Sequence, residues 1–262
     1  EQSIQSNSIA FQDNEEVARN MSNEVITRPS GHGALLPTLN SLESEVVLIK
    51  NIDNVQHYSK ANESIATWKM LSGLLLQFRQ DAKTVYDNPS RNGLVELNKK
   101  YQLFDAQTLV DIHSEEAIRQ LIDRPTRVCG MVKNEGQPGG GPFWVENAGK
   151  ITKQIVEKAQ ISAENEQRAL LLRSTHFNPV MIALSPRSLE NKKFDLLDFR
   201  DEEAYFIVKK TAEGQNIRYM EQPGLWNGSM ANWNSIFVEI PNSVFSPVKT
   251  ILDLLDPLHT SH

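Results

Sequence analysis

The sequence contains little cysteine, no long apolar run and no cluster of positive charge. Its single cysteine, Cys129, cannot form a disulfide within the chain. No apolar run approaches the ~18 residues that a membrane-spanning helix needs. No basic stretch followed by an apolar one opens the chain, as it would in a secretion signal. We therefore expect a cytoplasmic protein in a reducing setting, without membrane contact.

The charge balance also argues against one class of partner. The chain has 27 Lys and Arg residues against 33 Asp and Glu residues, which gives a net charge of −6. Because no basic stripe or Lys/Arg run is present, a nucleic acid is an unfavourable partner. A small phosphorylated ligand remains compatible with this charge, since it needs only a few well-placed lysines.

The residues that are present alternate between strand and helix patterns. Apolar residues three and four apart, with fitting caps and breakers, predict helices over residues 64–81, 93–103, 115–122 and 248–255. Apolar and β-branched runs predict strands at 45–51, 127–133, 180–183 and 235–240, and a strand pair at 205–209 and 217–221. Because some neighbouring strands lack a helix between them, we expect an α/β fold with a mixed sheet rather than a purely parallel one.

A Gly-His-Gly loop and an aspartate flank the first predicted strand, which has the β-branched content of a buried strand. Gly31, His32 and Gly33 precede this strand, and Asp53 follows its carboxyl end, where α/β sheets bind ligands. Amides beside glycine can bind a phosphate or the edge of a base. A carboxylate in that place suits Mg²⁺ or a ribose hydroxyl. The alternatives are a simple turn for the loop and a capping or turn role for Asp53.

Two further segments carry polar groups that suit a phosphorylated ligand. Lys133 ends a predicted strand and is followed by a loop with three glycines at 139–141. Such a loop is either a linker or a place where backbone approaches a ligand closely. His176 and Asn178 lie in a turn between two apolar runs, where they contact sugar hydroxyls or simply close an Asx turn.

Lys249 lies near the predicted start of the last helix, behind Pro247, and proline is favoured in a first helical turn. A lysine there opposes the helix dipole, unless an anion binds the amides and the ammonium together. The alternative is a solvent-exposed lysine without a ligand. No zinc-ligand spacing, Walker loop or Gly-x-Ser-x-Gly elbow is present.

In their order along the chain, these segments resemble the UDP-sugar pyrophosphorylases, the UTP-dependent uridylyltransferases that act on sugar 1-phosphates. That family has a P-P-G-H-G-D loop, a strand ending in N-x-D-N, and a V-P-R-S-R-F-x-P-V-K segment followed by D-L-L. The corresponding residues here are 29–34, 51–54, 240–249 and 253–255.

The whole chain is more similar still to an uncharacterised bacterial family, a domain of unknown function. Members of that family share a V-C-G-M-V-K-N-E-G-x-P-G-G-G-P-F-W-V stretch, found here at residues 128–145, and S-T-H-F-N-P, found at 174–179. The combined resemblance covers about residues 28–255.

The resemblance implies a nucleotidyltransferase fold (GT-A, Rossmann-like) with a mixed, mainly parallel sheet, and it implies roles for particular residues. The nucleotide contacts correspond to Gly31, His32, Gly33 and Asp53. Asp53 also corresponds to a Mg²⁺ ligand. Lys249 and Lys133 correspond to catalytic lysines that contact phosphates. The residues on the sugar-phosphate side correspond to Gly139, Gly140, Gly141, His176 and Asn178.

The sequence also departs from the pyrophosphorylase pattern. Ala34 replaces an acidic residue, Asn242 and Val244 replace two arginines, and nothing in residues 1–28 resembles the family's triphosphate-binding glycine loop. The resemblance therefore implies a domain that is incomplete at its N-terminus. We expect a polar lead-in over 1–28 (a loop, a weak helix or a disordered segment), the C-terminal part of a nucleotidyltransferase-like domain over 29–256, and a tail over 257–262.

Our leading hypothesis is that the intact protein transfers a nucleotidyl group from an NTP, with UTP favoured, to a sugar 1-phosphate. It would use Mg²⁺ and release pyrophosphate. Its expected partners are the nucleotide, the sugar phosphate and the missing N-terminal part of the same protein. Two alternatives stay open: a non-catalytic nucleotide- or phosphosugar-binding protein on the same fold, and a structural or interaction fragment of a larger enzyme.

Overall fold

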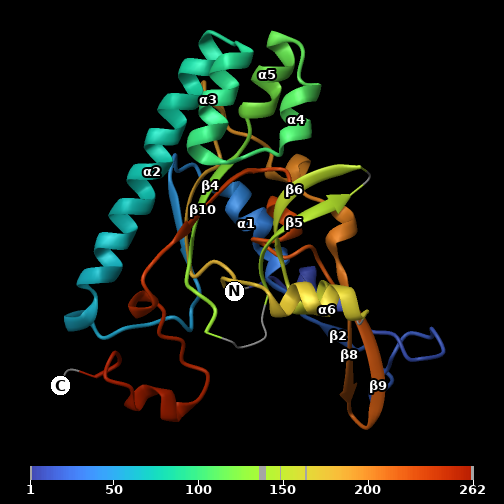
Figure 1. Ribbon diagram of the computed structural model, residues 1–262. Helices are drawn as coiled ribbons and strands as arrows, with labels where there is room; N and C mark the ends of the chain where they lie inside the picture. The colour runs from blue at the N-terminus through green and yellow to red at the C-terminus, as the bar shows by residue number, and fades with distance from the viewer. Residues whose placement is uncertain (1, 136–139, 148, 163, 261–262) are drawn as a thin grey trace. The chain divides into compact units, whose positions relative to one another are not determined.

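The computed structural model describes residues 2–135, 140–147, 149–162 and 164–260 (Figure 1). The chain forms two compact units. Residues 1–42 and 195–232 make the first, which we call the small unit. Residues 43–194 and 233–262 make the second, which we call the large unit.

A four-stranded sheet lies at the centre of the large unit. Its strands, in spatial order, are β10 (Asn234–Glu239), β4 (Thr126–Met131), β7 (Met181–Ser185) and β3 (Val47–Lys50). β4 and β10 are parallel, whereas β7 is antiparallel to both β4 and β3. The expectation of a mixed α/β sheet is therefore confirmed. β3, β4 and β10 run in the same direction, so most strands are parallel, as expected. The reversed strand β7 lies between β4 and β3, and two of the three strand pairings in the sheet are therefore antiparallel.

The register of the four strands brings several chain segments to one edge of the sheet. Met181 at the amino end of β7 pairs with Lys50 at the carboxyl end of β3 and with Gly130 near the carboxyl end of β4. Glu239 at the carboxyl end of β10 pairs with Met131. The segments that follow β3, β4 and β10, and the one that precedes β7, therefore start from the same edge.

The first predicted strand differs from the expectation in its position within the sheet. β4 and β7 are buried along their whole length. β3 is an edge strand with β7 as its neighbour, and Leu48 is 49% exposed. The β-branched run therefore predicted a strand correctly but not a buried one.

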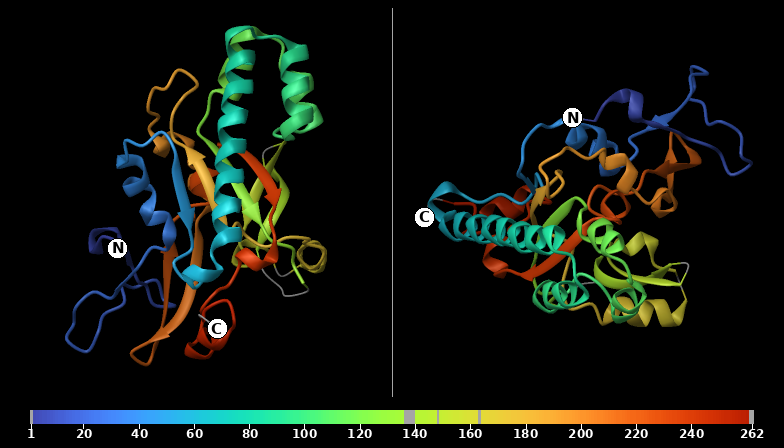
Figure 2. Two further views of the ribbon diagram at one scale, coloured as in Figure 1. Left: turned by 90° about the vertical axis from the view of Figure 1, so that its left-hand side faces the viewer. Right: turned by 90° about the horizontal axis from the view of Figure 1, so that it is seen from above.

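One long helix covers a face of the sheet. α2 (Asn62–Asp87) is longer than the predicted helix and ends directly before Pro89, as expected for a proline. It contacts β4 and β7 and lies along the sheet in Figure 2. Gly130 of β4 permits this close packing, because a Cβ there would lie 2.8 Å from Ile240 Cδ1 and 3.1 Å from Leu71 Cδ1.

Three shorter helices complete this layer: α3 (Arg91–Tyr101), α4 (Ala106–Asp111) and α5 (Glu115–Ile122). Ser90 caps α3 by accepting from the Gly93 amide, and Ser114 caps α5 by accepting from the Ala117 amide. The helix at 115–122 and its serine cap are confirmed, and α4 was not predicted.

The large unit also contains a hairpin of β5 (Gly141–Asn147) and β6 (Lys150–Val156). The short α6 (Asn165–Leu172) includes most of the apolar run at 170–173.

The small unit consists of two antiparallel strand pairs and short helices. β1 (Ser8–Ile9) pairs with β2 (Thr27–Arg28), and β8 (Phe206–Ala212) pairs with β9 (Gln215–Glu221), which confirms the predicted strand pair. The helical elements are α1 (Leu36–Ser41) and the 3₁₀ turns η1 (Ile4–Ser6), η2 (His32–Leu35), η5 (Leu196–Phe199), η6 (Glu202–Ala204) and η7 (Gly228–Met230).

The polar N-terminal segment contributes to the core of the small unit. Ala10, Ala18 and Ile26 are buried against Ile217 and Tyr219 of β9. Where we expected a loop, a weak helix or a disordered segment, residues 8–28 instead form two short strands joined by a bridged loop.

No helix among the described residues combines the length and the apolar composition that crossing a membrane requires.

The packing of α2 gives a first prediction. Phe78 is fully buried and meets Tyr101 of α3 edge to face, with ring centroids 5.0 Å apart. Phe78→Ala should lower the free energy of unfolding by about 3–5 kcal/mol, because a large cavity replaces the ring. Leu76→Ala on the same helix removes a side chain that is 56% exposed and should change stability by about 0.5 kcal/mol or less. Urea unfolding followed by circular dichroism measures both, and equal effects would contradict this packing.

Candidate functional site

A pocket opens at the edge of the sheet where the strand ends meet, and we call it the strand-edge pocket. Its volume is about 530 Å³, which lies within the ~300–1,000 Å³ of small-molecule sites. All of its lining residues belong to the large unit. The polar lining includes Asn51, Lys133, Glu135, Asn178, Asn242 and Lys249.

Asp53 and Lys249, two predicted site residues, form an ion pair beside this pocket. A backbone hydrogen bond also joins the two segments, because the amide of Val248, next to Lys249, donates to the Asp53 carbonyl oxygen at 2.8 Å. Asn54 holds the two segments together from inside. Its side-chain amide donates to the Val244 carbonyl oxygen at 3.2 Å, and its Oδ1 accepts from the Ser246 amide at 2.9 Å.

Asn54 is 1% exposed, and sequence reasoning missed its role. The sequence signal for this role was that Asn54 is the second asparagine of the Asn-Ile-Asp-Asn motif. Its buried side chain makes two hydrogen bonds to backbone and so fixes the position of the neighbouring Asp53.

The prediction of a helix over residues 248–255 is wrong. Residues 251–255 form only a short 3₁₀ turn, η9 (Ile251–Leu255). The Lys249 and Thr250 amides donate to Asp253 Oδ2 at 2.7 and 2.6 Å, and these hydrogen bonds, that of Thr250 first, lower the pKa of the Asp253 carboxyl. A carboxylate of the chain itself therefore already occupies the amides that we expected to bind an anion.

Lys133 and His176 meet at a carboxylate that sequence reasoning missed. Glu239 Oε1 lies 3.2 Å from Lys133 Nζ, and Glu239 Oε2 lies 3.1 Å from His176 Nε2. Hydrogen bonds from His176 and then Lys133 lower the pKa of the Glu239 carboxyl, so it is ionised at neutral pH. Glu239 lies near the end of the strand predicted at 235–240. A charged residue in that place is typical of a solvent-exposed strand end, so its sequence position gave no sign of this role.

Gly140 and Gly141, the two described glycines of the predicted three, approach protein backbone closely. A Cβ at Gly140 would lie 2.5 Å from the Val156 carbonyl oxygen, and one at Gly141 would lie 2.4 Å from the His176 carbonyl oxygen. Both glycines are thus required by packing. Gly139, the third predicted residue of this group, lies outside the described residues.

Asn178 lines the strand-edge pocket and has one unsatisfied atom. Its Nδ2 donates to Glu157 Oε2 at 3.0 Å. Its Oδ1 is buried and accepts no hydrogen bond from the part of the chain that the structure describes. A buried acceptor without a donor is costly, so a hydroxyl or amide of a ligand would be a favourable partner.

The predicted Gly-His-Gly loop belongs to the small unit. The His32 ring stacks on Trp226 with centroids 4.2 Å apart, and His32 Nδ1 accepts from the Leu225 amide at 2.7 Å. Burial lowers the pKa of His32 to about 4, so the ring is neutral at physiological pH. Gly33 has no room for a side chain, because a Cβ would lie 2.1 Å from the Pro223 carbonyl oxygen. These contacts account for the positions of His32 and Gly33 within the small unit.

The structure thus brings six predicted residues into the large unit around the strand-edge pocket. These are Asp53, Lys133, Gly140, His176, Asn178 and Lys249. Gly141 supports their turn through its contact with residue 176. The structure places Gly31, His32 and Gly33 in the small unit.

A preformed metal centre is not seen. Among residues 2–135, 140–147, 149–162 and 164–260, no three His, Cys, Asp or Glu side chains are grouped to hold a metal ion. Asp53, the predicted Mg²⁺ ligand, holds the Lys249 ammonium with Oδ2.

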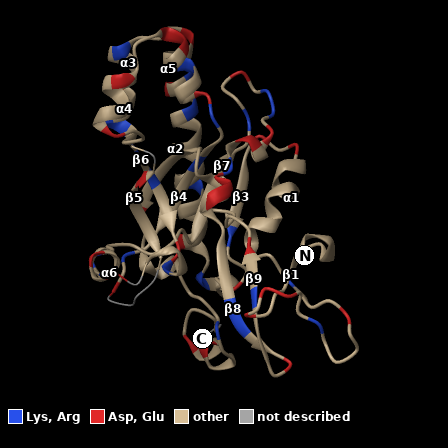
Figure 3. Cartoon of the chain, turned by 90° about the vertical axis from the view of Figure 1, so that its right-hand side faces the viewer, with Lys and Arg blue, Asp and Glu red and all other residues tan. Residues whose placement is uncertain are grey.

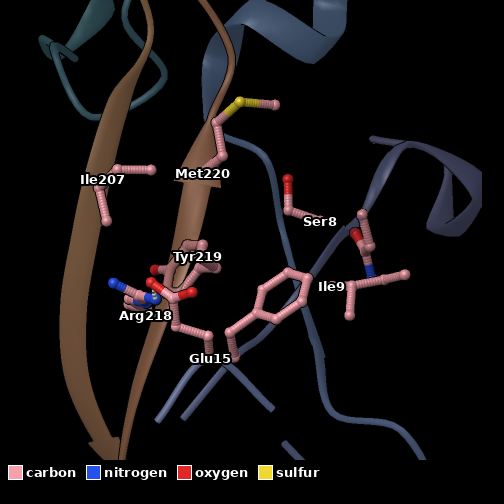
Figure 4. Close-up of a pocket in the computed structure, with 9 residues that line it drawn as sticks. Ser8, Ile9, Glu15, Ile207, Arg218, Tyr219 and Met220 are labelled. Carbon is pink, nitrogen blue, oxygen red and sulfur yellow. Dashed lines mark hydrogen bonds and ion pairs between the residues drawn. The ribbon is translucent and has the colours of Figure 1, made fainter. Parts of the chain in front are cut away.

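The small unit has an apolar pocket of its own, between β1 and β9 (Figure 4). Ile9, Ile207 and Met220 line it, and the Arg218–Glu15 ion pair closes one side at 3.0 Å. The neighbouring β8 carries two consecutive lysines, seen as a blue stretch in Figure 3. Sequence reasoning did not predict this pocket.

A protein family described as "Domain of unknown function (DUF4301)" matches residues 1–260 of this chain. No curated protein matches the sequence.

The chain is similar to several solved structures. A UDP-glucose phosphorylase from Trypanosoma brucei has 15% sequence identity and a TM-score of 0.50, with 97% of this chain and 46% of that chain covered. The S374W mutant of UDP-glucose pyrophosphorylase from Leishmania major, in complex with UDP-glucose, has 15% identity and a TM-score of 0.48, with 94% and 46% covered. A uridine diphosphate N-acetylglucosamine pyrophosphorylase from Trypanosoma brucei has 13% identity and a TM-score of 0.43, with 93% and 43% covered. This chain spans less than half the length of these proteins.

The buried His32 gives a second prediction. Its pKa falls from 6.5 in the unfolded chain to about 4 in the fold, so between these values the unfolded chain binds the extra proton. Stability should be full above about pH 6.5 and decrease as the pH falls through 4, by about 3 kcal/mol in total.

His32→Asn retains an acceptor for the Leu225 amide but cannot take up a proton, so the pH dependence between 6.5 and 4 should be correspondingly weaker. Urea unfolding of both proteins at several pH values in this range measures the difference. Identical pH profiles would contradict a buried, neutral His32.

Proposed function

We propose that this chain, which belongs to the family described as "Domain of unknown function (DUF4301)", binds a nucleotide sugar or its phosphorylated precursors in the strand-edge pocket. In this proposal it forms part of a sugar-1-phosphate nucleotidyltransferase. The observation that carries the proposal is that Lys133 and Lys249 line one pocket at the sheet edge, where α/β folds bind ligands.

The lining of the pocket supports a ligand with phosphates and hydroxyls. The two lysines supply positive charge for phosphate oxygens. The amides of Asn51, Asn178 and Asn242 can donate to and accept from hydroxyl groups. Phe245 adds an apolar wall on which a ring can pack.

Lys249 can exchange its protein partner for a ligand. Its side chain is 70% exposed, and an exposed ion pair contributes only about 0–1 kcal/mol. A phosphate that replaces the Asp53 carboxylate therefore gains a charged hydrogen bond at small cost. The segment that carries Lys249 stays in place, because Asn54 and the Val248 amide hold it.

The shared fold supports the proposed reaction. The Trypanosoma brucei structure with a TM-score of 0.50 is a UDP-glucose phosphorylase. We propose UTP and a sugar 1-phosphate as substrates. A sugar phosphate oxygen attacks the α-phosphorus of UTP, the bond from the α-phosphorus to the bridging oxygen breaks, and pyrophosphate leaves. Such transfer depends mostly on positioning and on neutralisation of phosphate charge. Lys249 and Lys133 supply that charge.

Mg²⁺ and the nucleotide base enter as further parts of the proposal. Mg²⁺ commonly takes one or two carboxylates together with substrate phosphates, and Asp53 offers one carboxylate beside this pocket, where it contacts Lys249. Bound there, Mg²⁺ would neutralise phosphate charge. Contact between the base and Gly31, His32 and Gly33 stays a prediction for the small unit.

Removal of the Lys249 ammonium provides the third prediction. Lys249→Ala should weaken UDP-glucose binding about tenfold or more, because a charged hydrogen bond contributes about 1.5–3 kcal/mol and Asp53 would then face the phosphates without a partner. Isothermal titration calorimetry measures the affinity.

Lys99→Ala is the matched control, since it removes the same charge from an exposed position on α3. We expect its affinity to stay within about twofold of the wild type. Equal affinity of Lys249→Ala and the wild type would contradict a phosphate at Lys249.

Turnover is the fourth prediction. The full-length protein, incubated with Mg²⁺, UTP and glucose 1-phosphate, should release pyrophosphate, and Lys249→Ala should reduce the rate by about tenfold or more. Parallel assays with other NTPs and sugar 1-phosphates define the substrate pair. Binding without turnover in every combination would favour the non-catalytic alternative.

A further inference from the structure

The Lys133–Glu239–His176 cluster joins three chain segments at the rim of the strand-edge pocket. Lys133 follows β4, His176 lies in the turn before β7, and Glu239 ends β10. Lys133 lines the pocket, whereas Glu239 contacts Lys133 and does not line the pocket itself. A side chain in this position can control where the lysine ammonium points without touching the ligand itself.

The backbone forces Lys133 and His176 close together. They form an antiparallel bridge, flanked by hydrogen bonds from the Asn134 amide to the Thr175 carbonyl oxygen at 2.9 Å and from the Phe177 amide to the Val132 carbonyl oxygen at 3.1 Å. This pattern defines a non-hydrogen-bonded pair, in which opposite side chains point the same way and lie close. A lysine opposite a second potential cation is unfavourable by itself.

Glu239 offsets this unfavourable pairing, because one carboxylate oxygen contacts each of the two side chains. The contacts are Oε1 to Lys133 Nζ at 3.2 Å and Oε2 to His176 Nε2 at 3.1 Å. An ionised carboxylate only accepts hydrogen bonds, so His176 Nε2 carries its proton. Thr175 Oγ1 lies 2.9 Å from His176 Nδ1 and donates to it when the ring is neutral. Glu239 and Thr175 thus fix both the orientation and the tautomer of the ring.

We propose that Glu239 is a positioning residue that holds Lys133 toward the strand-edge pocket and fixes the His176 ring with its proton on Nε2. This inference rests on the proposed function, since it names the group that prepares Lys133 for a phosphate. The carboxylate acts by reaching both side chains at once, since each of its two oxygens accepts from one of them. With Glu239 removed, Lys133 would sample its many rotamers, and binding would have to order it.

The variant Glu239→Asp separates reach from charge. Aspartate keeps the negative charge but is one methylene shorter, so it cannot make both contacts at about 3 Å. We expect UDP-glucose and UTP to bind about five- to tenfold more weakly to Glu239→Asp than to the wild type in calorimetric titration. We also expect the imidazole ¹⁵N shifts of His176 to change from the Nε2–H tautomer to a mixture of tautomers.

Two further variants act as controls. Glu146→Asp on β5 shortens an exposed glutamate and should leave affinity and shifts unchanged. Glu239→Gln keeps the length of the side chain, but its amide offers one accepting oxygen and one donating nitrogen, so it cannot accept from both Lys133 and His176, and we expect its affinity to lie below that of the wild type. Melting temperatures within a few degrees of the wild type establish that all variants fold.

The outcomes separate this inference from the proposed function. Unchanged affinity and an unchanged His176 tautomer in Glu239→Asp would overturn the positioning role while the pocket's function stands. Binding to Glu239→Gln that is tighter than wild type, with Glu239→Asp unchanged, would show that Glu239 acts by charge alone and would also overturn it. If the wild type binds neither ligand, the proposed function fails, and the tautomer change in Glu239→Asp still decides whether Glu239 positions His176.

Discussion

The hydrogen-bonded register of β4 with β7 and β10 determines where the Lys133–Glu239–His176 cluster lies at the strand-edge pocket. β4 is buried throughout and pairs with β10 on one side and β7 on the other. Met131 lies beside Glu239, and Gly130 lies beside Met181. Because side chains alternate between the faces of a strand, a shift by one residue would move Glu239 away from Lys133. The core beneath α2 therefore supports the site directly, as it holds these strands in register.

The strand-edge pocket contains two lysines, and without a ligand the positive charge of each is balanced by a carboxylate. Each of its two lysines contacts a carboxylate, Glu239 for Lys133 and Asp53 for Lys249. Balanced pairs avoid repulsion between cations, and exposed pairs exchange readily for a stronger partner. The diphosphate of a nucleotide sugar carries more charge in total than either carboxylate and can accept from several donors. This arrangement suits a protein that binds phosphorylated metabolites reversibly.

Sequence patterns predicted the elements that depend on local signals. The apolar spacing of α2, the Ser114 cap of α5 and the strand pair at 205–221 follow from propensity and periodicity. The polar residues Asp53, Lys133 and Asn178 were predicted because each follows or precedes an apolar run, and Lys249 was predicted because it follows Pro247 at the expected start of the last helix. Glu239, Asn54 and Glu157 were missed, since their roles arise from contacts between segments far apart in sequence. The final helix was predicted wrongly because the Asp253 carboxylate takes the amides of residues 249 and 250 and stabilises a 3₁₀ turn instead. The glycines at 33, 140 and 141 carried a true signal of close approach, and the approaching group is protein backbone.

A crystal structure of the protein with UDP-glucose and Mg²⁺ would show whether the strand-edge pocket binds the phosphates of a nucleotide sugar. We expect a diphosphate within hydrogen-bonding distance of the Lys133 and Lys249 ammonium groups, with the Asp53 contact to Lys249 exchanged for a phosphate oxygen. UDP-glucose bound away from both lysines, or both ion pairs intact beside a fully occupied ligand, would contradict it.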